Sequence, residues 1–242
     1  MNLYLNADCM NPETGLPSYP DNYFDLAIVD PPYGINMDGG KMGFNGKMKR
    51  SGTTNLSLMG KEYAKKEWDT AIPDDKYFNE LFRVSRHQII WGNNYFGFRG
   101  GAIFWDKDNG NSNFSDGEIA YQSFTKSIRK FKFRWHGFFQ EKMAAELREH
   151  KIHPTQKPMA LYRWLVKNYA KQGDRILDTH VGSASSLVVY EEMGFEYVGF
   201  ELDADYYRDS CKRLEAFRAQ PKLFTGAEIF EASKQPIQGS LF

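Results

Sequence analysis

Short apolar runs alternate with helix-like segments along most of this chain, and that alternation limits the available folds more than any other feature. Residues 24–29 are mostly apolar and end at Asp30-Pro31-Pro32, the pattern of a buried strand. Similar strand patterns occur at 88–91, 102–105, 175–178 and 197–200. Helices are expected at 74–86, 116–127, 158–170, 185–193 and 203–219. The alternation predicts an α/β fold.

The size and charge of the chain exclude several classes of protein. A length of 242 residues fits one α/β domain. The 31 basic and 31 acidic residues cancel, so an anionic partner would have to be bound by local patches. Two cysteines, Cys9 and Cys211, are too few for a disulfide framework or a cysteine zinc site. We expect a cytoplasmic protein without a secretory signal, a membrane span or a metal site.

The segment Asp30-Pro31-Pro32-Tyr33 carries the most specific chemistry. It follows the strand expected at 24–29, and in open α/β sheets ligands bind at the carboxyl ends of strands. The Asp30 carboxylate and the Pro31 carbonyl can each accept an N–H group, while Tyr33 can stack on a planar ring. These groups suit a heterocycle with an amino substituent. A proline turn in which Asp30 caps the loop explains the same residues without a ligand.

At this point the chain resembles a known family. Asp30-Pro31-Pro32-Tyr33 after a strand is similar to the catalytic motif of S-adenosylmethionine-dependent DNA amino-methyltransferases of the beta class. The resemblance covers most of the chain, and the motifs occur in the permuted order of that class. It implies a circularly permuted Rossmann-like sheet with helices on both faces and inserted target-recognition loops. Asp30, Pro31, Pro32 and Tyr33 would then be the catalytic residues.

Four further segments resemble the cofactor-binding motifs of this family. They are Asn6–Cys9 beside the adenine, His153–Pro158 beside the methionine, the glycine-rich loop 176–185 and the ribose-binding strand end 200–203. Glu201 lies 19 residues after Gly182, close to the spacing that places an acid at a ribose. The resemblance implies these S-adenosylmethionine contacts: Asp8, Cys9, Thr155, Lys157, Asp178, His180, Gly182, Ser183, Ala184, Glu201 and Leu202.

Two positions depart from the family pattern. His180 stands where phenylalanine is usual, and Ala184 stands where glycine is usual. If position 184 has a positive φ, alanine there is strained by about 1 kcal/mol. These departures motivate an alternative in which the chain is a non-catalytic DNA-binding relative with a degenerate cofactor loop. A different dinucleotide-binding enzyme fits less well, because the full G-x-G-x-x-G pattern is missing.

The expected reaction is methylation of the N6 amino group of an adenine that is flipped out of double-stranded DNA. Aspartate at the first motif position resembles the N6-adenine type; the same chemistry on cytosine N4, or on RNA, is the alternative. Cytosine carbon-5 methylation lacks its Pro-Cys pair, and zinc deamination lacks its ligand pattern. Because no nuclease motif is present, a solitary methyltransferase is expected.

Two basic segments are candidates for DNA binding. Residues 41–67 contain seven basic and two acidic side chains, and residues 126–151 contain eight and three. The second segment interleaves aromatic and basic residues, as in a β-ribbon with one packed and one basic face. Solvated loops are the alternative for both. The predicted contacts are Lys41, Lys47, Lys49, Arg50, Lys126, Arg129, Lys130, Lys132 and Arg134.

The domain boundaries follow from these patterns. A catalytic domain is expected over 1–226, with DNA-recognition insertions at 35–70 and 106–152, followed by a flexible tail at 227–242. The tail ends in a sequence similar to the pentapeptide that binds the bacterial sliding clamp. It departs from that pattern at the second position, where Gly239 replaces the usual apolar residue. A clamp partner is therefore a hypothesis, with contacts at Gln238, Ser240, Leu241 and Phe242.

Overall fold

One mixed sheet organises the described part of the chain. The computed structural model describes residues 2–41, 62–110, 115–136, 139–140 and 149–235. Among these, eight strands form the sheet in the order β1-β12-β11-β2-β5-β7-β6-β8, and β7 is the one antiparallel strand. The strands are β1 (Leu3–Asn6), β2 (Phe24–Val29), β5 (Ser85–Trp91), β6 (Gly101–Asp106), β7 (Gly117–Gln122), β8 (Ile128–Lys132), β11 (Arg175–Asp178) and β12 (Glu196–Glu201).

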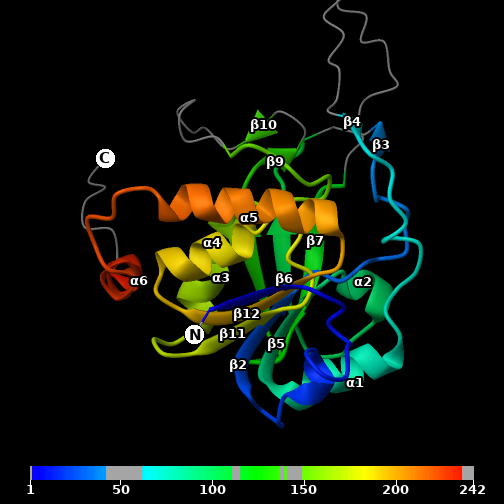
Figure 1. The fold of residues 1–242 in the computed structure, drawn as a ribbon, viewed down its shortest axis with the longest axis horizontal. Helices are drawn as coiled ribbons and strands as arrows, with labels where there is room; N and C mark the ends of the chain where they lie inside the picture. The colour runs from blue at the N-terminus through cyan, green and yellow to red at the C-terminus, as the bar shows by residue number, and fades with distance from the viewer. Residues whose placement is uncertain (1, 42–61, 111–114, 137–138, 141–148, 236–242) are drawn as a thin grey trace, which may run out of the picture.

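Helices cover both faces of this sheet, so the predicted α/β architecture is confirmed (Figure 1). Leu26 and Ile28 of β2 pack in one core with α3 to α6, whereas Ala27 and Val29 pack in a second core with α1. The sheet is therefore buried on both faces, which explains why its central strands read as apolar runs. The helices are η1 (Leu16–Ser18), α1 (Asp75–Val84), α2 (Asn93–Phe96), α3 (Met159–Tyr169), α4 (Ser185–Glu192), α5 (Ala204–Arg218) and α6 (Gly226–Lys234).

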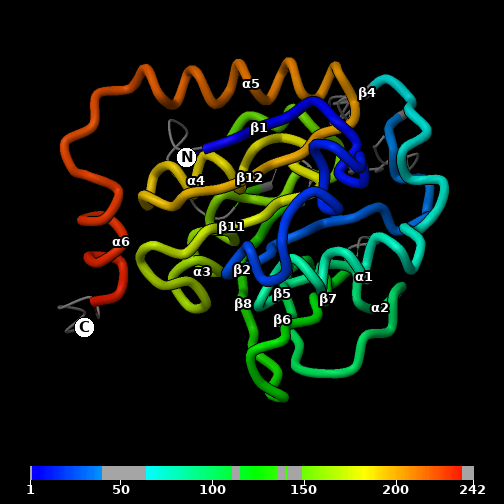
Figure 2. Tube along the Cα trace, turned by 60° about the horizontal axis from the view of Figure 1, so that its bottom comes forward, coloured from blue at the N-terminus to red at the C-terminus, as the bar shows by residue number. Residues whose placement is uncertain are grey.

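The carboxyl ends of the parallel strands lie at the same edge of the sheet (Figure 2). Asp30 follows β2, Thr179 follows β11, and Leu202 follows β12. Ala7 follows β1 at the same edge. Four sequence motifs that are far apart along the chain therefore lie together, where α/β sheets bind ligands.

The segment 116–127 is a strand and a turn, so the predicted helix is wrong. Gly117–Gln122 forms β7, which pairs with both β5 and β6. Glu118, Ala120 and Gln122 share the inward face, because side chains alternate along a strand. A Cβ on Gly117 would lie 2.4 Å from the Phe104 ring and from the Trp105 carbonyl oxygen, so this end of β7 needs glycine. Sheet pairing overrides the local helix pattern here.

The predicted insertions are only partly separate from the sheet. Because β7 and β8 belong to the main sheet, residues 117–132 are not an inserted loop. After β8, β9 (Trp135–His136) and β10 (Phe139–Gln140) form a small antiparallel ribbon. In the other segment, β3 (Gly40–Lys41) pairs with β4 (Glu62–Tyr63). The residues between β3 and β4 lie outside the described part of the chain.

The predicted flexible tail begins too early. Thr225 and Glu228 form a reciprocal capping box that starts α6, which continues to Lys234. Phe230 of α6 is fully buried against Phe195. Ile229 packs beside it as a partly buried side chain, so two adjacent apolar residues anchor this helix. Residues 236–242, which contain the proposed clamp-binding positions, lie outside the described residues.

The described residues contain neither a membrane-spanning helix nor a cluster of potential metal ligands. No helix there is long and apolar enough to cross a membrane. No group of three or more potential metal-ligating side chains gathers there either.

Candidate active site

The loop that carries Asp30 is held by a buried carboxylate that lies 36 residues after Tyr33. Asp69 Oδ1 accepts hydrogen bonds from the backbone N–H groups of Tyr33 and Gly34 at 2.7 and 2.8 Å, and its Oδ2 accepts from Met37 at 2.8 Å. Asp69 is 2% exposed, so water does not compete for these bonds. The loop after the two prolines therefore has a fixed path. Sequence reasoning missed Asp69, which lies in a segment with no motif.

Both carboxylate oxygens of Asp30 have partners within the protein. Its Oδ1 accepts a hydrogen bond from the Tyr33 hydroxyl, and its Oδ2 lies 2.5 Å from Lys157 Nζ. Lys157 Nζ also donates to the Tyr33 hydroxyl at 3.2 Å. The sequence predicted Lys157 as a cofactor contact; the structure places its ammonium group on Asp30. A contact between residues 127 positions apart has no signal in a single sequence.

Lys157 joins Asp30 to a second acid. Lys157 Nζ lies 3.0 Å from Glu118 Oε2, and Glu118 Oε1 accepts from Lys107 Nζ at 2.5 Å. Burial alone would raise the pKa of Glu118, but Lys157 and Lys107 outweigh it and lower that pKa to about 2. Burial would lower the pKa of Lys157, and Asp30 and Glu118 reverse that effect and raise it. Glu118 and Lys107 are site residues that sequence reasoning did not identify.

The ring of Tyr33 is packed from two directions. It stacks on Tyr95 with a centroid distance of 5.0 Å and an interplanar angle of 18°. Gly92 lies so close that a Cβ there would be 2.2 Å from Tyr33 Cε1. The residue after β5 must therefore be glycine for Tyr33 to occupy this position. The contact of the Tyr33 hydroxyl with Asp30 was not predicted from the sequence, and the predicted stacking of Tyr33 on a planar ligand stays a prediction.

A cavity of about 820 Å³ lies beside Asp30 at the carboxyl edge of the sheet. Its volume falls within the range of small-molecule sites. Asp30, Trp68 and Tyr206 are among the residues that line it. Nine of the predicted cofactor residues also line this cavity: Asp8, Cys9, Thr155, Lys157, His180, Gly182, Ser183, Glu201 and Leu202. The other two, Asp178 and Ala184, are buried and are not part of its lining.

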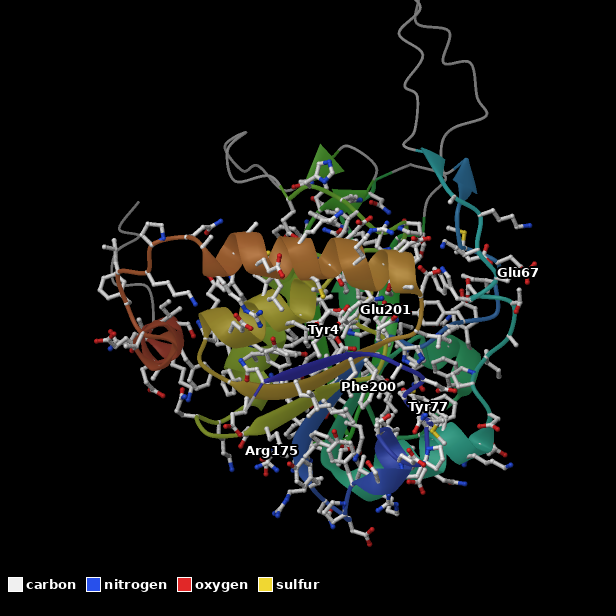
Figure 3. The ribbon with its side chains drawn as sticks, in the orientation of Figure 1. Tyr4, Glu67, Tyr77, Arg175, Phe200 and Glu201 are labelled. Carbon is white, nitrogen blue, oxygen red and sulfur yellow. The ribbon has the colours of Figure 1, made fainter. Side chains whose placement is uncertain are left out.

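Glu201 connects two parts of this cavity wall, and Figure 3 shows it near the carboxyl edge of the sheet. Its Oε2 accepts from the backbone N–H of Gly182, and its Oε1 accepts from that of Asp203, both at 2.8 Å. Gly182 has a φ of +55°, and no heavy atom lies closer than 3.6 Å to a Cβ placed there. Gly182 therefore has a backbone conformation that favours glycine and lines the cavity beside the His153 ring, and its predicted contact with a ligand stays a prediction.

Below the cavity, Asp178 supports the loop without reaching its surface. Its Oδ1 accepts from the backbone N–H of His180 at 3.0 Å, and its Oδ2 accepts from Ser186 Oγ at 2.5 Å. Burial raises the pKa of Asp178 to about 7, although both hydrogen bonds oppose that rise. Asp178 therefore fixes the start of the loop and the first turn of α4.

His180 is held as a neutral imidazole. Thr179 Oγ1 lies 2.9 Å from His180 Nδ1 and 2.7 Å from the Tyr77 hydroxyl, and the Tyr77 and His180 rings meet edge to face. Figure 3 labels Tyr77, which α1 contributes. Burial lowers the pKa of His180 to about 4. At neutral pH this position therefore presents an uncharged aromatic ring, much as phenylalanine would.

Ala184 is strained in the way the departure from glycine predicted. It is the N-cap residue of α4, with φ +58° and ψ +23° in the left-handed region. Its methyl group is fully buried in the core. The protein folds with this strain because the surrounding core fixes the turn.

A second cavity of about 340 Å³ adjoins the first one. The two cavities share the wall residues Asp30, Pro32, Trp68, Thr155, Gln156 and Lys157. The smaller cavity is also lined by Pro31, Tyr33 and Trp105, and by Glu118 and Lys107. Its aromatic walls and polar end suit a planar, hydrogen-bonding ring. Asp30 thus lies between a large cavity and a small aromatic one.

Comparisons with known proteins agree with this geometry. Residues 126–212 match the N6_N4_Mtase family model, which is described as DNA methylase. The match covers less than half of the chain. The segment includes Lys157, Gly182 and Glu201, whereas Asp30–Tyr33 precede it.

Individual proteins are similar to this chain over different lengths. The Type II methyltransferase M2.DpnII of Streptococcus pneumoniae is 32% identical over 102 residues, 42% of this chain and 33% of that protein. The match therefore spans about a third of that relative. The Putative methylase YubD of Escherichia coli K12 is 22% identical over 224 residues, 89% of this chain and 91% of that protein. The crystal structure of the M1.HpyAVI–SAM complex has a TM-score of 0.53 at 16% identity, covering 88% of this chain and 100% of that one, which supports the same fold.

Residues 126–212 also contain five of the DNA-binding candidates, and the structure separates four of these into two groups. Strand β8 runs parallel to β6, with Lys132 opposite Asp106 and Ile128 opposite Ala102. Because Lys107, which follows β6, lines the smaller cavity, Lys132 and Arg134 lie on the cavity side. Both have ion pairs with Asp108, at 2.9 and 3.1 Å. Lys126 and Arg129 lie toward the other end of the strand.

Five further DNA-binding candidates complete the predicted set. Lys130 is paired with Asp106 at 3.3 Å. The side chain of Lys41 and the whole of Lys47, Lys49 and Arg50 lie outside the described residues. These positions stay predictions from the sequence.

Proposed function

We propose that this chain transfers a methyl group from S-adenosylmethionine to the exocyclic amino group of a base in DNA, with the N6 of a flipped adenine as the target. The observation that carries the proposal is that Asp30 and Pro32 line two adjoining cavities, while Pro31 lines the smaller one. The match of residues 126–212 to the N6/N4 DNA methylase family supports it independently. Aspartate at position 30 supports adenine over cytosine.

The larger cavity fits S-adenosylmethionine by size and by chemistry. Its volume of about 820 Å³ accommodates a nucleoside with an amino-acid side chain. Glu201 and Asp8 supply carboxylate acceptors for hydroxyl and amino groups, and Gly182 leaves the backbone open. When bound, the cofactor supplies a methyl group on a sulfonium, which is a good leaving group. The chain's own task is therefore to present the nucleophile.

Asp30 and the Pro31 carbonyl would accept the two N–H bonds of the target amino group and turn its nitrogen toward the larger cavity. Each carboxylate oxygen has more than one lone pair, so Asp30 can accept such a bond while it keeps Lys157. In the overall reaction the nitrogen–methyl bond forms, the carbon–sulfur bond breaks, and the nitrogen loses a proton. Asp30 is placed to accept that proton. Most of the rate gain would come from positioning and electrostatics.

Tritiated-methyl transfer to unmethylated DNA, followed by nucleoside mass spectrometry, tests the proposal. We expect N6-methyldeoxyadenosine and a loss of about 100-fold or more in Asp30→Ala. Asp21→Ala is the matched control, because Asp21 is exposed and paired with Arg83 at 2.7 Å. N4-methyldeoxycytidine would retain the mechanism and change the base. Near-normal transfer by Asp30→Ala would refute the role of Asp30, and no transfer together with no cofactor binding would refute the function.

For DNA binding, we propose that Lys132 and Arg134 contact phosphates beside the smaller cavity, whereas Lys126 and Arg129 do not. The Lys132→Ala/Arg134→Ala double variant should weaken binding and reduce the salt dependence by about one counterion for each lost contact. The Lys126→Ala/Arg129→Ala variant removes the same charge at the other end of β8 and should bind like the natural sequence. Equal effects of the two double variants would contradict this placement.

A further inference from the structure

Four charged side chains form a continuous chain beside the smaller cavity, with Lys157 buried and the other three partly buried. Asp30 contacts Lys157 at 2.5 Å, Lys157 contacts Glu118 at 3.0 Å, and Glu118 contacts Lys107 at 2.5 Å. The side chain of Lys157 is 3% exposed, and those of Asp30 and Glu118 are 18% and 24% exposed. The two acids and two bases balance in charge. Removing any one of them would leave an uncompensated charge away from water.

The backbone around Lys157 is fixed independently of this chain. Gln156 Oε1 accepts from the backbone N–H of Ile152 at 2.9 Å, and the Gln156 carbonyl accepts from Trp135 Nε1 at 2.7 Å. Lys157 itself precedes Pro158, the N-cap residue of α3. The main chain therefore places the lysine stem, while Asp30 and Glu118 determine where its ammonium group lies.

Glu118 is placed by the strand that interrupts the parallel order of the sheet. In β7 it pairs with Trp105 of β6, and it shares its face with the buried Ala120 and Gln122. Lys107 Nζ lies over the Trp105 ring, 4.8 Å from the ring centroid. Glu118 thus stands on a rigid element and faces two lysines, which leaves its carboxylate little freedom.

We propose that Glu118 is a positioning residue for the methyl transfer: it shares Lys157 Nζ with Asp30 and offsets part of the lysine's charge, so that Asp30 keeps one orientation and stays basic enough to accept the proton of the target amino group. The proposal rests on the proposed function, because it assigns Asp30 the contact with the target amino group. Under this proposal, β7 contributes to catalysis indirectly, because Glu118 contacts Lys157 and Lys157 contacts Asp30. A structural ion pair alone would stabilise the fold without setting the charge of Asp30.

The groups that face Asp30 predict how its titration responds to each change. Lys157 and the Tyr33 hydroxyl favour its ionised form, whereas burial, Glu118 and the more distant Asp178 disfavour it. Tyr162 also faces Asp30, and His153 lies near Lys157 with a pKa that burial, followed by Lys157, lowers to about 3. Loss of Lys157 should therefore raise the pKa of Asp30, and loss of the Glu118 charge should lower it.

Two variants separate the proposal from a purely structural role. In Lys157→Met, we expect the acid limb of kcat/KM to move up by about one pH unit and kcat to fall about 100-fold. In Glu118→Gln, which keeps the shape and an acceptor oxygen, the limb should move to lower pH. The double variant should lie between them. Glu192→Gln is the matched control, because Glu192 pairs with Arg163 at 2.7 Å and lines neither cavity.

A second readout does not depend on methyl transfer. In protein labelled with ¹³C in its aspartate carboxyls, the Asp30 signal is identified by its loss in Asp30→Asn and then titrated. Opposite shifts in Lys157→Met and Glu118→Gln support the proposal, even if the natural sequence transfers no methyl group and the proposed function fails. If circular dichroism shows that Lys157→Met is unfolded, Glu118→Gln decides alone. An Asp30 titration in Glu118→Gln that equals the Glu192→Gln control, or moves upward, overturns the proposal.

Discussion

Replacing Ala184 with glycine tests how much strain the turn before α4 stores. Alanine in the left-handed region is unfavourable by about 1–2 kcal/mol, and glycine is not. Against this relief, the variant loses a fully buried methyl group, worth about 0.8 kcal/mol. Glycine also makes the unfolded chain more flexible, which destabilises the fold by about 0.4–1 kcal/mol. The opposing effects nearly cancel, so the free energy of unfolding should change by less than about 1 kcal/mol.

Ala27→Gly is the matched control for this prediction. Ala27 is also fully buried, but it lies in the middle of β2 in ordinary strand conformation. Its replacement loses the same methyl group and gains the same unfolded-state flexibility without any relief of strain. Ala27→Gly should therefore be less stable than Ala184→Gly by about 1–2 kcal/mol, the strain energy itself.

Urea unfolding followed by circular dichroism measures both variants, with the midpoint and the slope fitted separately. An unchanged slope would show that the comparison concerns the native state. If both variants are destabilised equally, the alanine at position 184 stores no strain and the reasoning is refuted. Calorimetry with S-adenosylmethionine should show binding by Ala184→Gly, because the Ala184 methyl group does not line the larger cavity.

Two other predictions concern the loop after β5 and the pH dependence of stability. Gly92→Ala should destabilise the protein by about 1–3 kcal/mol and reduce methyl transfer, because its Cβ would lie 2.2 Å from the Tyr33 ring. Gly97→Ala is the control, with a similar positive φ and no neighbour within 4 Å, and it should keep its activity. Equal losses of methyl transfer in the two variants would contradict this prediction. Burial lowers the pKa of His180 to about 4 from 6.5, so the unfolded chain binds the extra proton and stability falls as the pH drops from 6.5 to 4. His180→Phe cannot titrate and should lose less stability over that range, as urea unfolding at both ends would show; an identical decline would argue against a buried neutral histidine.

The sequence predicted those parts of the fold in which local pattern and tertiary environment agree. The strand at 24–29 and the strand at 175–178 have the predicted bounds, because both are buried on two faces and read as apolar runs. It failed for 116–127, where Glu118 and Ala120 favour a helix locally and pairing with two neighbouring strands decides the outcome. It also missed α6, whose contact with the core comes from Phe230 and its neighbour Ile229 in an otherwise largely polar segment.

The candidate site divides in the same way. Asp30 and Gly182 could be placed from the sequence, because each follows a strand at the ligand-binding edge of the sheet. The contacts of Lys157 with Asp30 and Glu118 could not, because they join side chains that are far apart in the sequence. The role of Asp69 could not be predicted either, because its partners are backbone N–H groups, which leave no pattern in residue type.

The wall shared by the two cavities has a consequence for the order of events. Asp30 and Lys157 line both cavities, so under the proposed function the donor and the acceptor would each contact them from a different cavity. Donor and acceptor can then arrive in either sequence, and a spent donor can be exchanged while the acceptor stays in place. In kinetic terms, the proposed reaction would then follow a random-order mechanism with a ternary complex, in which the acceptor nitrogen and the donated methyl group meet directly beside Asp30.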